Sequence, residues 1–254
     1  MDIISEIKKK KELSDIPNSL IKEILEKSLK KNFKNSIEEI KNKKQLKIII
    51  KEVRSELRKY TGRFQISSKK RIALLKENRI EELLKTHSST KERFLDYKIL
   101  KSEIKKLNPS SILDLGCGLN PIIIANNKIK YYAYDIKKDE LNLISEFFKN
   151  NKINGKTVYK DIKKVKRFPK TDLTLILKVL DIIDQKGHRN AKEIIQKISS
   201  KNIIASFSLI TLSGKPMSFP RRYWFEKTLE ILNLKFKVKR TKTEIFYIIN
   251  RLEI

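Results

Sequence analysis

The sequence has very few of the residues that build disulfide frameworks and metal centres. Among its 254 residues are one cysteine and two histidines. Cys117, standing alone, excludes disulfide frameworks and cysteine-rich zinc sites and indicates a reducing compartment. His87 and His188 lack both partner histidines and metal-ligand spacing, so we expect no bound metal. Because no signal peptide and no apolar run of roughly 20 residues is present, we expect a cytoplasmic protein without a membrane partner.

Acidic residues are scarce relative to basic ones. The 30 Asp and Glu residues face 59 Lys and Arg residues, which leaves a net charge of +29. Such an excess is typical of proteins whose partner is a polyanion. It is densest in residues 41–80, which hold 14 basic and 3 acidic residues. This segment is the predicted phosphate-contacting surface, and its RNA-binding candidates are Arg54, Arg58, Arg63 and Arg71.

Glycine is also rare, with six residues, yet two of them lie close together in residues 110–121, which read SSILDLGCGLNP. This pattern predicts an apolar strand, a glycine turn and a proline-opened helix. Gly116 and Gly118 can take positive φ and bring the backbone close to a ligand, while the helix start offers free N–H groups. A dinucleotide-binding fingerprint requires a third glycine where Pro121 stands. The turn, with Asp114 before it, instead resembles motif I of S-adenosylmethionine (SAM) methyltransferases.

Two more strand-like runs end on acidic residues. Residues 130–134 lead to Asp135, which lies 21 residues after Asp114. Residues 156–160 lead to Asp161. In a SAM site, an acid after the second strand accepts from the ribose hydroxyls and one after the third strand accepts from the adenine amine. The alternative for any one of these acids is that it caps a helix or a turn, but three strands that each end on an aspartate favour a cofactor site.

The hydrophobic pattern predicts two domains. Residues 1–84 have helical spacing and form an all-helical, basic domain that we expect to dock on RNA; a solvated bundle without a partner is the alternative. Residues 85–254 are expected to form an α/β, Rossmann-like SAM-dependent methyltransferase domain with a seven-stranded sheet. Residues 85–108 form a bridging helix, opened by a capping box from Ser89 to Glu92. The other predicted helices cover residues 17–30, 36–60, 69–84, 184–199 and 221–232, and the last strands cover residues 202–209, 236–240 and 244–250.

Several stretches together point to one family. Residues 83–93 read LLKTHSSTKER and residues 114–121 read DLGCGLNP. Further along the chain come LKVL at residues 177–180, SF at 206–207, LSGK at 212–215 and WFE at 224–226. Over about residues 80–230 the sequence resembles the aminoglycoside-resistance 16S rRNA (guanine-N7) methyltransferases.

This resemblance implies a function and assigns residues to it. The implied protein docks its helical domain on the small ribosomal subunit, uses SAM and methylates N7 of a decoding-site guanine in 16S rRNA. We expect it to be a monomer. Its implied cofactor residues are Arg93 for the SAM carboxylate, Gly116 and Gly118 for the methionine part, Asp135 for the ribose and Asp161 for the adenine, with His87, Asp114 and Leu177 beside them. The linker between Lys215 and Trp224 is shorter than in the family and lacks its Gly-Met pair, which leaves another rRNA or tRNA target open. A non-catalytic ribosome-binding factor of the same fold is the second alternative.

The residues also discriminate between target atoms. Methylation at carbon-5 of a pyrimidine needs a cysteine nucleophile, and Cys117 lies in the cofactor turn. Exocyclic amines need an Asn/Asp-Pro-Pro-aromatic tetrad, which residues 171–181 lack. For ribose oxygens, Lys178 and Asp181 make an incomplete set. Guanine N7 needs no general base, because its lone pair is available and orientation supplies most of the rate.

A guanine inside structured rRNA must leave its stack to be methylated. The candidates to position it are Lys178, Phe207 and Trp224, with Phe219 and Tyr223 as further aromatic groups. Lys215, Arg221 and Arg222 are the phosphate-binding candidates. The alternatives are that Trp224 packs on the sheet and that Lys178 only extends along a strand end towards water.

Overall fold

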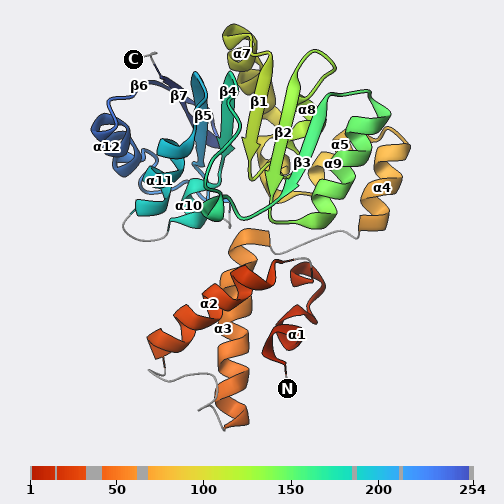
Figure 1. Cartoon of the computed structure of the whole chain (residues 1–254), viewed down its shortest axis with the longest axis vertical. Helices are drawn as coiled ribbons and strands as arrows, with labels where there is room; N and C mark the ends of the chain where they lie inside the picture. The colour runs from red at the N-terminus through yellow and green to blue at the C-terminus, as the bar shows by residue number, and fades with distance from the viewer. Residues whose placement is uncertain are drawn as a thin grey trace.

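The computed structural model describes residues 2–14, 16–32, 42–61, 68–184, 188–211 and 214–251. A seven-stranded sheet carries helices on both faces, and a smaller group of helices lies beneath one edge of that sheet (Figure 1). None of the described helices is long and apolar enough to cross a membrane.

The sheet has the order β3-β2-β1-β4-β5-β7-β6. Its first five strands in sequence run parallel, whereas β7 is antiparallel to both β5 and β6. Because the parallel strands all end at one edge, the residues that follow them meet there. The seven-stranded sheet confirms the predicted fold. The strands are β1 Ser111–Leu115, β2 Lys130–Asp135, β3 Gly155–Tyr159, β4 Leu173–Leu177, β5 Asn202–Ser208, β6 Lys235–Arg240 and β7 Glu244–Asn250.

Two hydrophobic clusters fill the two faces of the sheet. Every residue of β4 is buried, which is why this strand reads as a continuous apolar run. One face is covered by α4 Ser68–Lys76, α5 Ile80–Lys85, α7 Tyr97–Leu107, α8 Asn120–Ile124 and α9 Lys138–Asn150. The other is covered by α10 Leu180–Ile183, α11 Arg189–Lys197, α12 Tyr223–Ile231 and the short η4 Ile162–Lys164.

The predicted bridging helix is broken into three pieces. They are α6 Ser88–Arg93, the single turn η3 Phe94–Asp96 and α7. The predicted capping box is wrong, because α6 begins at Ser88 and its N-cap, His87, makes no side-chain capping bond. Glu92 binds Lys178 instead. A tertiary partner therefore replaces the local one that the spacing suggested.

The N-terminal helices pack around an apolar core of their own. They are α1 Ile3–Lys8, η1 Lys11–Leu13, α2 Asn18–Asn32 and α3 Lys43–Thr61. Their core includes Leu20, Ile49 and Leu57. Residues 36–41 of the second predicted helix lie outside the described residues.

The next two helices belong to the sheet. Leu74 and Leu75 of α4, with Leu83 and Leu84 of α5, lie in the cluster that covers β1 and β2. Because of this packing, we place the division between the two parts between residues 61 and 68 rather than at residue 84.

Candidate functional site

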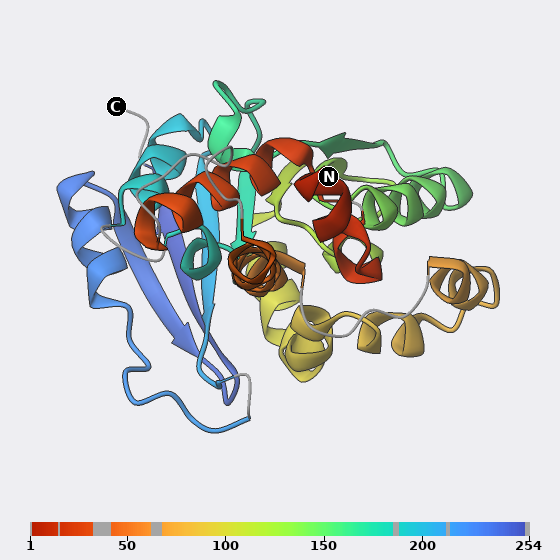
Figure 2. The same ribbon diagram turned by 90° about the horizontal axis from the view of Figure 1, so that it is seen from below.

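A cavity of about 910 Å³ lies at the carboxyl ends of the parallel strands. Seen from below, α1 and α2 lie across this edge of the sheet, with α3 viewed end-on (Figure 2). The helical part contributes walls to the cavity through Leu20, Arg58 and Tyr60. Ile136, just after β2, packs against the core of the helical part. The sheet side contributes six of the predicted cofactor residues, His87, Gly116, Gly118, Asp135, Asp161 and Leu177.

The glycine turn lies between β1 and α8 and has the backbone form that the sequence predicts. Gly116 has a φ of +70° and Gly118 a φ of +48°. A Cβ on Gly116 would lie 2.5 Å from Cγ2 of Val179, and a Cβ on Gly118 would lie 2.9 Å from Cε1 of His87. Both positions therefore require glycine for conformation and for space.

Asp135 is the last residue of β2, and its side chain holds the glycine turn in place. One carboxylate oxygen accepts from the N–H of Gly118 at 2.9 Å, and the other accepts from the N–H of Lys137 at 3.0 Å. Burial raises the pKa of Asp135 to about 6. The charge of Glu140 adds to that rise and the two backbone N–H donors oppose it. Asp135 also lines the cavity, where its carboxylate can accept from a ligand.

Asp161 follows β3 and starts η4. Its Oδ1 accepts from the N–H of Lys163 at 3.0 Å, which makes it an N-cap. Its Oδ2 is buried and has no hydrogen-bond partner among the described residues. A buried carboxylate oxygen without a donor is costly unless a ligand supplies one.

Four charged or titratable side chains meet beside the turn, and sequence patterns identified only one of them, His87, as a cofactor residue. Glu140, on α9, accepts from Lys137 at 2.6 Å and from Arg71 at 3.2 Å, and lies 3.7 Å from Nε2 of His87. Burial raises the pKa of Glu140, but Lys137, His87 and Arg71 outweigh it and hold that pKa well below its ordinary value. Burial lowers the pKa of His87 to about 4. Glu140 Oε2 and His87 Nδ1 are buried without a hydrogen-bond partner, and both residues line the cavity.

Arg71 is not on the surface where an RNA contact requires it. Its side chain is buried and donates to the hydroxyl and the carbonyl oxygen of Thr86 at 2.9 and 2.8 Å, as well as to Glu140. Arg71 thus ties α4 to α9 and to the residues before α6.

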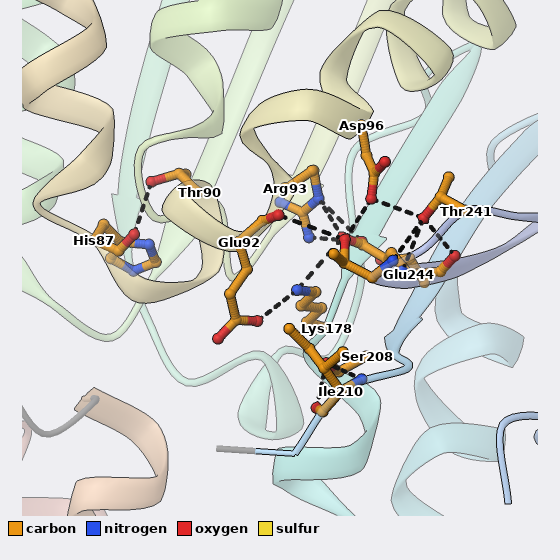
Figure 3. Close-up of polar contacts among 12 residues, drawn as sticks. His87, Thr90, Glu92, Arg93, Asp96, Lys178, Ser208, Ile210, Thr241 and Glu244 are labelled. Carbon is orange, nitrogen blue, oxygen red and sulfur yellow. Dashed lines mark hydrogen bonds and ion pairs between the residues drawn. The ribbon is translucent and has the colours of Figure 1, made fainter. Parts of the chain in front are cut away.

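A second buried ion cluster joins α6 to β4 and β7 (Figure 3). The fully buried Arg93 donates to Glu244 from Nε at 3.0 Å and from Nη2 at 2.9 Å, and to Asn120 at 2.8 Å. Lys178 lies 2.8 Å from Glu92 and 3.5 Å from Glu244. A cofactor carboxylate reaches Arg93 only if these side chains move, so its carboxylate-binding role stays a prediction. Lys178, by contrast, lines the cavity.

Asp114 is fully buried and does not line the cavity. Its Oδ2 accepts from the hydroxyl of Tyr131 at 2.7 Å, while Oδ1 has no partner among the described residues. Burial raises the pKa of Asp114 to about 7. The structure therefore places this predicted cofactor residue inside the sheet, behind the residues that face the cavity.

The two aromatic candidates for holding a base are largely engaged with the protein. Phe207 is fully buried and packs edge-on against Trp224, Phe225 and Tyr247. Trp224 stacks on His188, with ring centroids 3.9 Å apart and planes 8° apart. Phe207 is a core residue, and one face of Trp224 is covered. Phe219 and Tyr223 are instead 81% and 68% exposed.

The predicted RNA-binding residues differ in whether their side chains already bind acceptors of the protein. Arg54 donates to the carbonyl oxygens of Ile7 and Glu6, and Arg58 donates to Glu12 at 2.9 and 3.0 Å. Arg222 is buried against Asp181, and Arg221 is half-exposed and bound to Glu226. Lys215 is exposed, and Arg63 lies outside the described residues. Lysines along α3 are exposed as well: Lys43, Lys44, Lys47 and Lys51.

The donor set of the cavity suits an organic cofactor. Among the described residues, no group of three or more histidine, cysteine or acidic side chains is arranged to hold a metal ion. A nucleoside with a polar tail requires acceptors that still lack a hydrogen-bond donor, glycines that allow close approach and an apolar wall; among the described residues, Asp161 and Glu140 supply such acceptors and Leu177 the wall.

Comparison with known proteins agrees with this geometry. The family model described as "Ribosomal RNA methyltransferase (FmrO)" matches residues 72–242. The crystal structure of the 16S rRNA methyltransferase RmtF, in complex with S-adenosyl-L-homocysteine, superposes with a TM-score of 0.80 at 21% identity, over 98% of this chain and 96% of that one. The fold is thus that of a SAM-dependent methyltransferase.

Two curated relatives carry the same name, 16S rRNA (guanine(1405)-N(7))-methyltransferase. The protein from Proteus mirabilis is 28% identical over 182 residues, which are 67% of this chain and 65% of the relative. The protein from Serratia marcescens is 26% identical over 192 residues, 73% of this chain and 75% of the relative. The match to the Proteus mirabilis protein spans slightly less than two thirds of that protein's length.

Proposed function

Because the chain belongs to the FmrO family of ribosomal RNA methyltransferases, we propose that it transfers a methyl group from SAM to N7 of a guanine in the decoding region of small-subunit (16S) rRNA. The observation that carries the proposal is one cavity in which the glycine turn meets Asp135, which ends β2, and Asp161, which follows β3. The consequence for the host is resistance to the aminoglycosides that bind this region of the ribosome.

The residues of the cavity fit SAM. Gly116 and Gly118 would line its methionine part, Asp135 would accept from the ribose hydroxyls, and the unpaired Oδ2 of Asp161 would accept from the adenine amine. When bound, SAM supplies an electrophilic methyl group on a positively charged sulfur. The apolar side chain of Leu177 helps to exclude water from this wall of the cavity.

The target atom follows from what the site lacks and holds. Burial raises the pKa of Cys117 well above its ordinary value, so this thiol does not serve as the nucleophile that carbon-5 methylation needs. N7 of guanine carries a free lone pair, and its methylation requires orientation without removal of a proton. Lys178 lines the cavity and donates to Glu92, and we assign it a role in positioning the base.

The RNA-facing surface is assigned from exposed groups. Lys215 is exposed and suits phosphate contacts, as do the exposed lysines of α3, which are Lys43, Lys44, Lys47 and Lys51. Phe219 and Tyr223, with Arg221 over the Tyr223 ring at 5.4 Å, form an exposed aromatic and cationic group of a kind that stacks on unpaired bases. We infer that the small ribosomal subunit is the partner and that a single cytoplasmic chain acts on it.

The test is a methyl-transfer assay with methyl-labelled SAM and, separately, small subunits, large subunits and total tRNA. We expect label in the small subunit alone, and borohydride and aniline cleavage should break the 16S rRNA at one decoding-region guanine. Asp135→Ala is the matched inactive variant. Label in tRNA or in the large subunit would contradict the target, and SAM binding without any label would point to a non-catalytic ribosome-binding factor.

A further inference from the structure

One side chain of the helical part reaches into the surroundings of the predicted adenine site. Glu23, on α2, accepts from the ammonium group of Lys163 at 2.8 Å, although the two residues are 140 positions apart. Lys27 lies 3.0 Å and Lys164 lies 3.8 Å from the same carboxylate. The Lys163 side chain is 11% exposed and that of Glu23 is 25% exposed, so the contact is partly shielded from water.

Lys163 also lies close to Asp161. Its Nζ lies 3.9 Å from Oδ2 of Asp161, beyond hydrogen-bond distance, while its backbone N–H caps Oδ1 at 3.0 Å. Oδ2 is the buried oxygen without a partner, and Asp161 lines the cavity. The ammonium group therefore has two carboxylates within reach and donates to the one that belongs to the helical part.

We propose that Glu23 is a positioning residue for the cofactor site, which holds the Lys163 ammonium group away from Asp161 and so keeps Oδ2 open to the exocyclic amine of the adenine ring. The inference rests on the proposed SAM site. It makes cofactor affinity depend on how the helical part is seated against η4, because α2 supplies Glu23.

The physical basis is competition for one acceptor. Without Glu23, the Lys163 ammonium needs to move by only about 1 Å to donate to Asp161 at the distance that charged donors and carboxylates adopt. A charged donor next to Oδ2 outcompetes the neutral adenine amine for the same oxygen. Any change that separates α2 from η4 therefore weakens cofactor binding. Because the two equilibria are linked, bound cofactor stabilises the contact between α2 and η4 by the same factor.

The experiment measures binding of S-adenosylhomocysteine (SAH) by calorimetry to the full chain. For Glu23→Gln we expect roughly a tenfold rise in Kd, which corresponds to about 1.4 kcal/mol. Glu26→Gln is the matched control, because Glu26 lies on the same helix, is exposed and loses the same charge. Adding Lys163→Met to Glu23→Gln should restore the affinity, and Lys163→Met alone, which removes the competing ammonium group, should bind SAH at least as tightly as the wild type.

A second ligand separates positioning from general damage. S-inosylhomocysteine has an oxo group in place of the adenine amine, so the wild type should bind it more weakly than SAH, and Glu23→Gln should reduce this preference. Equal Kd values for Glu23→Gln and Glu26→Gln, or an equal loss for both ligands, would overturn the inference while leaving the proposed function intact. A wild-type protein that does not bind SAH would overturn the proposed function and this inference with it.

Discussion

The two parts of the molecule use charge in opposite ways. Among the side chains that the structure describes up to residue 61, Ser28 is the one buried polar group, and the core is otherwise aliphatic. The sheet part buries many charged groups, including Arg93, Glu140, Asp114 and Glu244. None of the described charged side chains of the helical part is therefore buried, whereas several charged side chains of the sheet part are buried around the cavity. Substitutions in the two parts test this contrast, and we expect their effects on the free energy of unfolding to range from several kcal/mol in the sheet part to none at the surface of the helical part.

Glu244→Ala should destabilise the protein most. Arg93 is fully buried, and Glu244 accepts hydrogen bonds from two of its nitrogen atoms, Nε and Nη2. The variant therefore leaves an uncompensated buried cation. We expect a loss of about 3–5 kcal/mol in urea unfolding. Glu193→Ala, which removes an exposed pair with Arg189, is the control and should cost less than about 0.5 kcal/mol. Similar losses for the two variants would mean that Arg93 finds water or another partner.

Asp114→Asn should change how stability depends on pH. Burial raises the pKa of Asp114 to about 7, from an unfolded value of about 3.9. Between these values the folded state binds more protons, so the contribution of Asp114 to stability is full below about pH 4 and is lost as the pH rises through 7. The difference in unfolding free energy between variant and wild type should shift in favour of the variant by roughly 1 kcal/mol per pH unit across this range. The opposite slope from His87, whose pKa burial lowers to about 4, cancels in that difference.

The measurement is urea unfolding of both proteins from pH 4 to pH 8. The amide that replaces the carboxyl group of Asp114 keeps a carbonyl oxygen that can accept from the Tyr131 hydroxyl, so the hydrogen bond survives the substitution. Parallel stability curves for the two proteins would show that Asp114 ionises normally, and that the sheet part tolerates buried charge better than its burial implies.

The same contrast explains what the sequence could and could not predict. The strand β4 was predictable because all of its residues are buried, and β1 is buried except at its first residue. Asp114 lies within β1, Asp135 ends β2 and Asp161 follows β3, so each acid is close in sequence to its strand. The glycine turn, Asp135 and Asp161 lie in one cavity because the parallel strands all end at one edge of the sheet. Local information was sufficient there.

Partners far apart in the chain were not predictable. Glu244 lies 151 residues from Arg93, Glu140 lies 69 residues from Arg71, and no local pattern links either pair. Basic density in residues 41–80 likewise did not distinguish Arg71, which is buried, from Lys47, which is exposed. The sequence identified the segment correctly as basic but could not say which cations had acceptors already.

Gly118→Ala should have a moderate effect on stability and a large one on the cofactor. A residue with a φ of +48° costs about 1–2 kcal/mol when it carries a Cβ, and here the Cβ also lies 2.9 Å from His87. We expect that loss in urea unfolding, together with at least a tenfold weaker affinity for SAH. Gly214→Ala is the control, because Gly214 has a φ of +81° with nothing within 4 Å of its added Cβ. It should show the strain and no change in SAH binding; equal SAH affinities for the two variants would remove the turn from the cofactor site.

The smallest effect on stability should come from Lys47→Gln with Lys51→Gln. Both side chains are exposed and one helical turn apart on α3, and the core beneath them is aliphatic, so we expect no measurable change in the unfolding midpoint. Binding to small subunits should weaken. The slope of the logarithm of the binding constant against the logarithm of the salt concentration should become less steep by about one unit per lost phosphate contact.

Lys101→Gln with Lys105→Gln is the matched control, since these lysines are exposed at the same spacing on α7, which lies away from the helical part (Figure 1). If the α7 variant lost as much salt dependence as the α3 variant, the net charge of the chain would account for binding, and the helical part would have no special place in docking. If only the α3 variant lost it, the surface charge of the helical part would be the docking determinant, and the buried charge of the sheet part would be reserved for the cofactor.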